Sequence, residues 1–235
     1  MVAFNTLLAA CTAITGVIAS PAMSLNKRQA TPNQEGIHDG YFYSWWSDGA
    51  SPVTYANGPG GSYSVQWQQG GNLVGGKGWN PGTSRTTVML YVFTSNKKKK
   101  NLSAFLAPCS DMLQYLCIYG WTRNPLVEYY VIESHGEYNP GGQAQPRGSI
   151  EHAGSTYQLY ESTRHQQPSI DGTQTFQQYW AIRQQQRQSG TVDMGVIFQA
   201  WQDAGMPLGN HYYQVVATEA YNSAGRSSVT VESPP

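Results

Sequence analysis

The fold is decided by a stretch that reads NPLVEYYVIES, residues 124–134. Val127, Tyr129 and Val131 alternate with Glu128, and this rhythm is typical of a β-strand, whose successive side chains point to opposite faces. Glutamate is depleted in strands and is rarely buried without a partner. The stretch therefore predicts a strand with one face that is not an ordinary packed core, and it marks Glu128 as a functional candidate.

The rest of the chain after Gly40 repeats short strands separated by turns rich in glycine, proline and asparagine. Strand-like segments read YFYSWW, SYSVQW, CIYGWTR, STYQLYES, TFQQYWAI, YYQVVATEAY and SSVTVES. This spacing is expected of a single all-β sandwich or barrel, and 235 residues suit one such domain. The stretch GVIFQAWQDAGMPLG differs, because its apolar residues recur at helical spacing. It predicts one short helix at about 196–204.

The composition excludes several classes of function. The chain has 14 basic and 14 acidic residues, so it lacks the excess positive charge that is typical of nucleic-acid-binding proteins. Its 16 tyrosines and 7 tryptophans supply ample apolar surface for a core, which excludes a disordered chain. A surface rich in Tyr, Trp, Gln, Ser and Gly suits neutral, hydroxylated partners such as sugars.

The first 28 residues are expected to be a signal peptide and a short propeptide. The apolar stretch from Leu7 to Ala19 has the length of a signal-peptide core and is too short to span a membrane. Lys27 and Arg28 form a dibasic processing site, so that residues 29–235 would be the mature domain. We therefore expect a secreted, extracellular protein with no membrane partner. The alternative is a weakly apolar N-terminus without a targeting role.

The cysteines and histidines indicate neither a disulfide framework nor a metal site. Cys11 falls in the leader, whereas Cys109 and Cys117 are eight residues apart and could close a small loop. The sequence alone does not decide whether they pair, because pairing depends on their geometry. The five histidines are scattered and show no metal-ligand spacing, so we expect no metal.

Two glutamates lie on strand faces that also carry hydroxyl groups. Glu219 shares a face with Tyr213 and Tyr221, and Glu128 shares a face with Tyr130. Hydrolysis of a glycosidic bond uses two carboxyl groups. At a separation of about 5 Å, one attacks the anomeric carbon while the other donates and later accepts a proton. The alternative is a pair of edge glutamates that face solvent, which is common in antiparallel sheets.

A series of longer motifs, in chain order, resembles the fungal xylanases of glycoside hydrolase family 11. The motifs are SWWSDG, GGSYSVQW, GNLVGGKGWNPG, YGWTRNPLVEYYVIES, RHQQPSIDGTQTFQQYW, SGTV, AWQDAGM and YYQVVATEAYNSAG. They cover about residues 38–86 and 116–231. The resemblance implies a β-jelly-roll sandwich of two curved antiparallel sheets with one short α-helix, bent around a cleft. It also implies a retaining endo-β-1,4-xylanase that needs no cofactor. We expect a monomer that binds xylan and xylo-oligosaccharides and no nucleic acid.

The resemblance also assigns roles to single residues. Glu128 falls at the position of the nucleophile and Glu219 at that of the acid/base. The residues that match substrate-binding positions are Trp46, Tyr119, Trp121, Arg123, Tyr130, Arg164, Pro168, Ser169, Ile170, Gln178, Tyr213 and Tyr221. Residues 168–173, PSIDGT, look like the thumb loop that closes over the substrate, and their proline and glycine favour a tight turn. We expect tyrosines and Arg123 to keep Glu128 ionised, and the Glu128 anion to raise the pKa of Glu219.

Two features depart from the family pattern. Gln69 stands where the family has Asn or Asp beside the acid/base, and its longer side chain leaves its contact with Glu219 open. We expect a weakly acidic to neutral pH optimum. Residues 88–114, which include four consecutive lysines, replace the usual strand, turn and return strand. We interpret this segment as a gene-model error, in which retained intron sequence accompanies a missing exon piece; a genuine insertion is the alternative.

A genuine insertion at 88–114 would remove or rebuild a strand that borders the cleft. Unpaired ladder groups on its neighbours would then predict low stability and reduced activity. The alternative function is therefore a non-catalytic or catalytically impaired xylan-binding β-sandwich. A non-catalytic module predicts that Glu128→Gln leaves function unchanged, whereas a xylanase predicts loss of hydrolysis.

Overall fold

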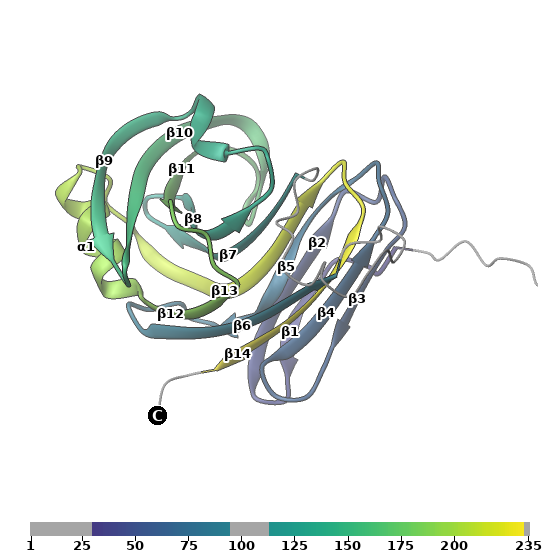
Figure 1. The fold of residues 1–235 in the computed structure, drawn as a ribbon. Helices are drawn as coiled ribbons and strands as arrows, with labels where there is room; N and C mark the ends of the chain where they lie inside the picture. The colour runs from purple at the N-terminus through teal and green to yellow at the C-terminus, as the bar shows by residue number, and fades with distance from the viewer. Residues whose placement is uncertain (1–29, 95–112, 233–235) are drawn as a thin grey trace, which may run out of the picture.

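A computed structural model describes residues 30–94 and 113–232 of the chain. Strands dominate this part of the protein, and the described elements follow one another as two packed sheets with one α-helix (Figure 1). The strands are β1 (Gln34–His38), β2 (Tyr41–Ser47), β3 (Val53–Asn57), β4 (Ser62–Trp67), β5 (Asn72–Trp79), β6 (Thr86–Thr94), β7 (Leu113–Arg123), β8 (Val127–His135), β9 (Gln145–His152), β10 (Ser155–Ser169), β11 (Gly172–Arg183), β12 (Ser189–Asp193), β13 (Asn210–Tyr221) and β14 (Gly225–Glu232).

The larger sheet has nine strands in the order β1-β2-β5-β13-β7-β8-β11-β10-β9, and the smaller has five in the order β12-β6-β14-β4-β3. The predicted jelly-roll of two curved sheets is confirmed. One neighbour pair differs from the expected antiparallel pattern, because β8 and β11 run parallel, with Glu128 opposite Gln178. The chain can return to β8 in the same direction because the hairpin of β9 and β10 lies between them in sequence.

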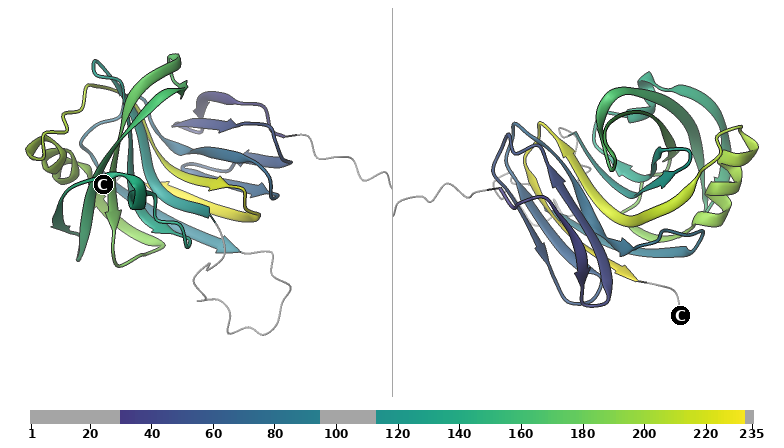
Figure 2. Two further views of the ribbon diagram at one scale, coloured as in Figure 1. Left: turned by 90° about the horizontal axis from the view of Figure 1, so that it is seen from above. Right: turned by 180° about the vertical axis from the view of Figure 1, so that it is seen from behind.

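The nine-stranded sheet is strongly curved, so that β8, β11, β10 and β9 curl round toward its inner, concave face (Figures 1 and 2). Its outer face packs on the five-stranded sheet and on the helix through a large apolar cluster that includes Trp45, Tyr129, Val131 and Trp201. Its inner face carries a second cluster, which includes Tyr119, Tyr130 and Trp180. Strand alternation thus gives the same strands two different buried faces.

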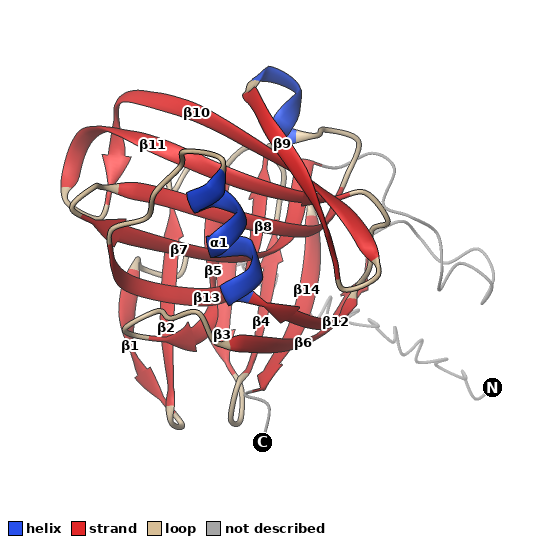
Figure 3. Cartoon of the chain, turned by 90° about the vertical axis from the view of Figure 1, so that its left-hand side faces the viewer, coloured by secondary structure: helices blue, strands red, loops and turns tan. Residues whose placement is uncertain are grey.

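Helix α1 (Met194–Asp203) covers the outer face of the large sheet (Figure 3). It begins two residues before the predicted start because the Asp193 carboxylate accepts a hydrogen bond from the Gly195 amide, at 2.9 Å, and caps the first turn. It ends at Asp203, and Gly205, two residues later, has a positive φ of 74° that suits glycine. Its side chains Ile197 and Trp201 are fully buried. No helix in the described ranges is long and apolar enough to cross a bilayer.

A genuine insertion at 88–114 is expected to remove or rebuild a strand that borders the cleft, and the described residues at both ends of this segment lie in paired strands. Residues 88–94 continue β6, which pairs with β12 and β14 in the five-stranded sheet. Residues 113 and 114 begin β7, which pairs with β13 and β8. The run TTVMLYVFT is rich in β-branched and aromatic residues and forms a strand without clean alternation. Residues 95–112, including Lys97–Lys100 and Cys109, lie outside the described residues.

Candidate active site

The inner face of the large sheet brings the predicted carboxyl groups and aromatic residues into one cleft. Register places Tyr213, Trp121, Glu128 and Gln178 side by side across β13, β7, β8 and β11. A second row runs from Trp46 on β2 through β5 to Glu219 on β13. The two rows meet on the inner face, because the charge of Glu128 in one row acts on Glu219 in the other.

Glu128 is buried and is held by three uncharged donors. The hydroxyls of Tyr119 and Tyr130 donate to Oε1 at 2.8 and 3.1 Å, and the Gln178 amide donates to Oε2. Burial raises the pKa of Glu128, while the bonds from Gln178, Tyr119 and Tyr130 counteract that shift by stabilising the anion. The charge of Arg164 acts in the same direction.

Glu219 lies in a different environment, although the two carboxyl groups influence each other. Its side chain is half-buried, and within the described residues its Oε2 atom has no hydrogen-bond partner. Burial, followed by the negative charge of Glu128, raises the pKa of Glu219 to about 8. The nearby Tyr130 hydroxyl and the charge of Arg164 lower the pKa of Glu219 and offset this shift only in part. At neutral pH Glu219 therefore keeps its proton, while Glu128 is surrounded by donors that favour its anion.

Aromatic side chains line the cleft around Glu128. Trp121 donates from its indole nitrogen to the Tyr119 hydroxyl at 2.7 Å, which orients that hydroxyl toward Glu128. Tyr130 stacks on Trp180, with ring centroids 4.3 Å apart and an interplanar angle of 12°. The sequence analysis did not assign Trp180, although it has the same parity as Gln178 on β11 and could have been found from that signal.

Tyr115 is a second cleft residue that the sequence analysis did not assign. It lies opposite Glu219 in the β7–β13 ladder, and the negative charge of Glu219 contributes to the raised pKa of Tyr115, after burial. Tyr115 lies four residues before Tyr119 on the same strand, so alternation places both side chains on the same face. This could have indicated its position in the cleft. Tyr213, by contrast, was predicted and is buried in the cleft, between Phe42 and Tyr119.

Arg123 does not take the place expected for it beside Glu128. Its guanidinium binds the carboxylate of Asp171 in the turn between β10 and β11. The basic residue whose charge acts on both Glu128 and Glu219 is Arg164, which is exposed on β10. The reason is that Asp171, in the thumb turn, is the carboxylate that binds the guanidinium N–H groups of Arg123.

The remaining predicted residues lie at the margins of the cleft. Pro168 and Ser169 belong to the thumb turn, and Ile170 packs against the apolar cluster of the inner face. Tyr221, at the end of β13, is 58% exposed. Gln69 is exposed in the loop between β4 and β5, and it does not hold the unpartnered oxygen of Glu219 in the described structure.

Cys117 is buried on the inner face of β7 and has no disulfide partner among the described residues. Its predicted candidate partner, Cys109, lies outside the described residues, so the pairing stays a prediction. Within the described ranges, no group of three His, Cys, Asp or Glu side chains could hold a metal ion.

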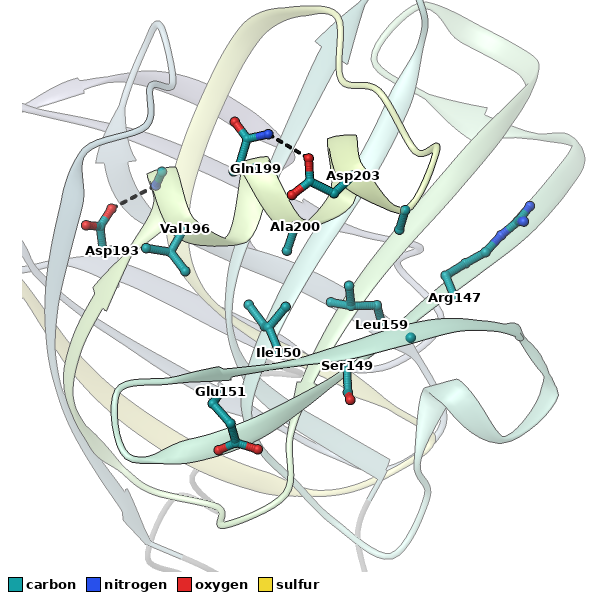
Figure 4. A pocket seen from close by; sticks show the side chains of 13 residues that line it. Arg147, Ser149, Ile150, Glu151, Leu159, Asp193, Val196, Gln199, Ala200 and Asp203 are labelled. Carbon is teal, nitrogen blue, oxygen red and sulfur yellow. Dashed lines mark hydrogen bonds between the residues drawn. The ribbon is translucent and has the colours of Figure 1, made fainter.

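A groove of about 730 Å³ lies on the opposite side of the sheet, between α1 and strands β9 and β10 (Figure 4). Its floor is aliphatic, and its charged groups already have partners. Asp193 caps the helix, Gln199 donates to Asp203 at 2.8 Å, and Arg147 pairs with Glu161. The side chains that line this groove do not include a coupled pair of carboxyl groups such as Glu128 and Glu219. We therefore assign the candidate active site to the cleft.

A curved jelly-roll whose inner face holds two electrostatically coupled carboxyl groups among aromatic residues has the architecture of a glycoside hydrolase. The chain belongs to glycosyl hydrolases family 11, whose family model matches residues 38–230. It is 64% identical over 236 residues to ethylene-inducing xylanase 4 of Verticillium dahliae. It is 56% identical over 245 residues to endo-1,4-beta-xylanase 1 of Pyricularia grisea, and 53% identical over 236 residues to endo-1,4-beta-xylanase I of Cochliobolus carbonum. Each alignment covers all of this chain and all of the relative.

Proposed function

We propose that this glycoside hydrolase is a secreted endo-1,4-β-xylanase that cleaves internal bonds of xylan with retention of configuration. The observation that carries the proposal is the electrostatic coupling of Glu128 and Glu219 across the cleft, where the anion of Glu128 helps to hold a proton on Glu219. Relatives that match the whole chain at 53–64% identity are named xylanases, which supports xylan as the substrate.

Glu219 is the acid in the first step of this mechanism. It donates its proton to the glycosidic oxygen, while an oxygen of Glu128 attacks the anomeric carbon and the leaving sugar departs as an alcohol. Esterification removes the charge of Glu128, so one cause of the raised pKa of Glu219 disappears. Glu219, now ionised, takes a proton from water as that water attacks the ester, and Glu128 is released as a carboxylate.

The other predicted site residues would bind and orient the sugar chain. Trp46 offers a half-buried indole face to a pyranose ring. Tyr119, Tyr130 and Gln178 fix the nucleophile, and Tyr130 also reaches Glu219. These contacts hold the two carboxyl groups in place before the substrate binds, which is how positioned groups lower a barrier.

We propose that residues 1–28 direct secretion and are removed, that the mature enzyme is a monomer, and that residues 88–114 derive from a gene-model error. The fungal origin of the named relatives is consistent with an enzyme that acts on external polysaccharide. Sequencing of the spliced transcript tests the segment, since a message with codons 88–114 intact contradicts the gene-model interpretation.

The activity is tested by hydrolysis of xylan and of cellulose with the 29–235 chain. We expect release of xylo-oligosaccharides from xylan alone, with the β-anomer formed first in a proton NMR time course. Glu128→Gln and Glu219→Gln should each lower the rate by on the order of 10⁴-fold or more. Hydrolysis of neither polymer by a folded wild-type chain would refute the proposal. It would favour the xylan-binding module without catalysis.

A further inference from the structure

The turn at the tip of the thumb is joined to the opposite part of the cleft by a charge pair. The turn connects β10 to β11, and Asp171 lies within it. The Nε atom of Arg123, at the end of β7, lies 3.0 Å from each carboxylate oxygen of Asp171, and its Nη2 atom lies 2.6 Å from Oδ1. This bidentate geometry fixes direction as well as distance, unlike a contact between two point charges.

Arg123 is itself supported from the far edge of the sheet. Its guanidinium lies over the ring of Tyr212, 4.2 Å from the centroid. The Tyr212 hydroxyl donates to Glu35 on β1 at 2.9 Å, and Ser44 on β2 donates to the other oxygen of Glu35 at 3.2 Å. The contacts therefore run from the edge strand through β13 and β7 to the thumb tip, and they limit where the guanidinium can point.

The thumb tip is built as a small rigid unit. The Ser169 hydroxyl donates to the Gly172 carbonyl at 2.7 Å and accepts from the Asp171 amide at 3.0 Å. Gln174 donates to the Asp171 carbonyl at 3.1 Å. Because the turn is bonded within itself, the carboxylate of Asp171 moves with the whole tip and not as a loose side chain.

The base of the thumb, in contrast, interrupts the regular ladder. The register of β10 on β11 shifts between Arg164 and Gln167, which marks a bulge. Gln166 within it has φ of 50°, a value that costs energy for a residue other than glycine. A rigid tip on an irregular base is the arrangement expected of an element that moves as a unit.

We propose that Asp171 and Arg123 form a latch that holds the thumb closed over the cleft, with Asp171 as a positioning residue. Closing the latch seats Ile170 against the aromatic inner face. It also sets the position of the Arg164 segment, whose charge acts on both glutamates. The consequence for substrate binding rests on the proposed function, because it concerns a sugar chain that lies beneath the thumb.

The strength of the latch suits a contact that opens and closes in each turnover. Both side chains are partly exposed, at 37% and 40%. Exposed pairs of good geometry change an equilibrium by about fivefold, and salt weakens them. Such a pair biases the thumb toward the closed position without trapping the substrate or the product.

The first test measures the latch without substrate. We expect Asp171→Asn to speed hydrogen–deuterium exchange of the amides in residues 166–174 by about fivefold at low salt. High salt should speed wild-type exchange there and leave that of the variant unchanged. The matched control is Glu161→Gln, which breaks the Arg147–Glu161 pair on β9 and β10 and should not alter exchange in the thumb. Equal exchange in Asp171→Asn and wild type would overturn the latch, as would an equal effect in the control.

The second test separates positioning from mere stability, using xylohexaose. Asp171→Asn should raise KM by about fivefold with kcat unchanged or higher, and Asp171→Glu should restore most of the loss. An unchanged KM together with faster thumb exchange would refute the positioning role. If the wild-type chain hydrolysed no xylan, the proposed function would fail. The exchange rates, which need no substrate, would still decide whether the latch exists.

Discussion

Strand β8 carries two buried glutamates that face opposite sides of the same sheet. Glu128 points into the cleft and is 8% exposed, whereas Glu133 points into the packed side and is 0% exposed. They are five positions apart, an odd number, so alternation places them on different faces. The two carboxyl groups share a strand and a degree of burial, and what differs is the set of groups around each of them.

Glu133 is paired with one cation and with a hydroxyl group to which a second cation donates. Arg187 pairs with its Oε2 atom through Nε, and Tyr157 donates to Oε1 at 2.6 Å. Arg183 donates to the Tyr157 hydroxyl at 3.0 Å and to the Ala153 carbonyl at 3.0 Å. This network ties β8, β10 and the segment before β12 together and leaves Glu133 no free access to a ligand.

Glu128 has neutral donors where Glu133 has cations. Two tyrosines and a glutamine satisfy its oxygens, and Arg164 acts on it only through its charge. A fixed ion pair would stabilise the anion in the ground state and would make it a poorer nucleophile. Neutral partners and an open face therefore indicate that a buried carboxylate is reactive. Pairing with cations indicates that it is structural.

The largest expected effect comes from neutralising each glutamate in turn. Glu128→Gln should lower kcat by on the order of 10⁴-fold and leave the midpoint of thermal unfolding unchanged or higher, because a desolvated charge is removed. Glu133→Gln should lower the free energy of unfolding by about 2–4 kcal/mol, because Arg187 loses its buried partner, with kcat of the folded fraction within about twofold. Initial rates on xylan and urea unfolding measure the two quantities.

These two variants serve as controls for each other, since the same atoms change on one strand. Loss of activity in a fully folded Glu133→Gln sample would contradict the assignment of Glu133 to a structural role. Unfolding of the protein by Glu128→Gln would contradict the assignment of Glu128 to a catalytic role.

A smaller effect is expected when one hydroxyl is removed from each face. Tyr130→Phe should lower kcat by about 10- to 100-fold, because a hydrogen bond to a charged group contributes about 1.5–3 kcal/mol, with little change in stability. Tyr157→Phe should lower the free energy of unfolding by about 1–3 kcal/mol and leave kcat unchanged. The same rates and unfolding curves test both variants. If Tyr130→Phe lost more stability than Tyr157→Phe, the assignment of catalysis to the inner face and of stability to the packed face would be wrong.

Much of this arrangement follows from the sequence, because alternation is a local property. The period of two over residues 127–132 predicts the strand and separates Glu128 from Tyr129, and the structure places them on the two faces as expected. The same reasoning overlooked Glu133, although its parity with Val131 marked it as a buried charge on the packed side. A buried carboxylate on the packed side needs a cation nearby. The two arginines of its network, Arg183 and Arg187, come from distant segments of the chain.

Contacts between distant segments could not be predicted in this way. The parallel pairing of β8 with β11 depends on the path of the intervening chain, and nothing in either strand encodes it locally. Arg123 shows the same limit, because its partner Asp171 is set by the curl of the thumb. The predicted start of α1 was two residues too late because it was taken from the apolar pattern, to which the Asp193 side chain that caps the helix does not belong.

The smallest expected effect is a shift in the ionisation of Glu219, which tests whether the two faces are electrostatically separate. Its pKa of about 8, above the ordinary 4.5, means that its acid form is lost and kcat/KM falls as pH rises through about 8. The unfolded carboxyl ionises near 4.5, so the same shift removes stability as pH rises from about 4.5 to about 8. Glu128→Gln removes one cause, and carbon-13 NMR titration should show a lower pKa that stays above 4.5 because burial remains. Glu133→Gln, on the packed face, should leave that titration unchanged, and an equal shift in both variants would contradict the separation.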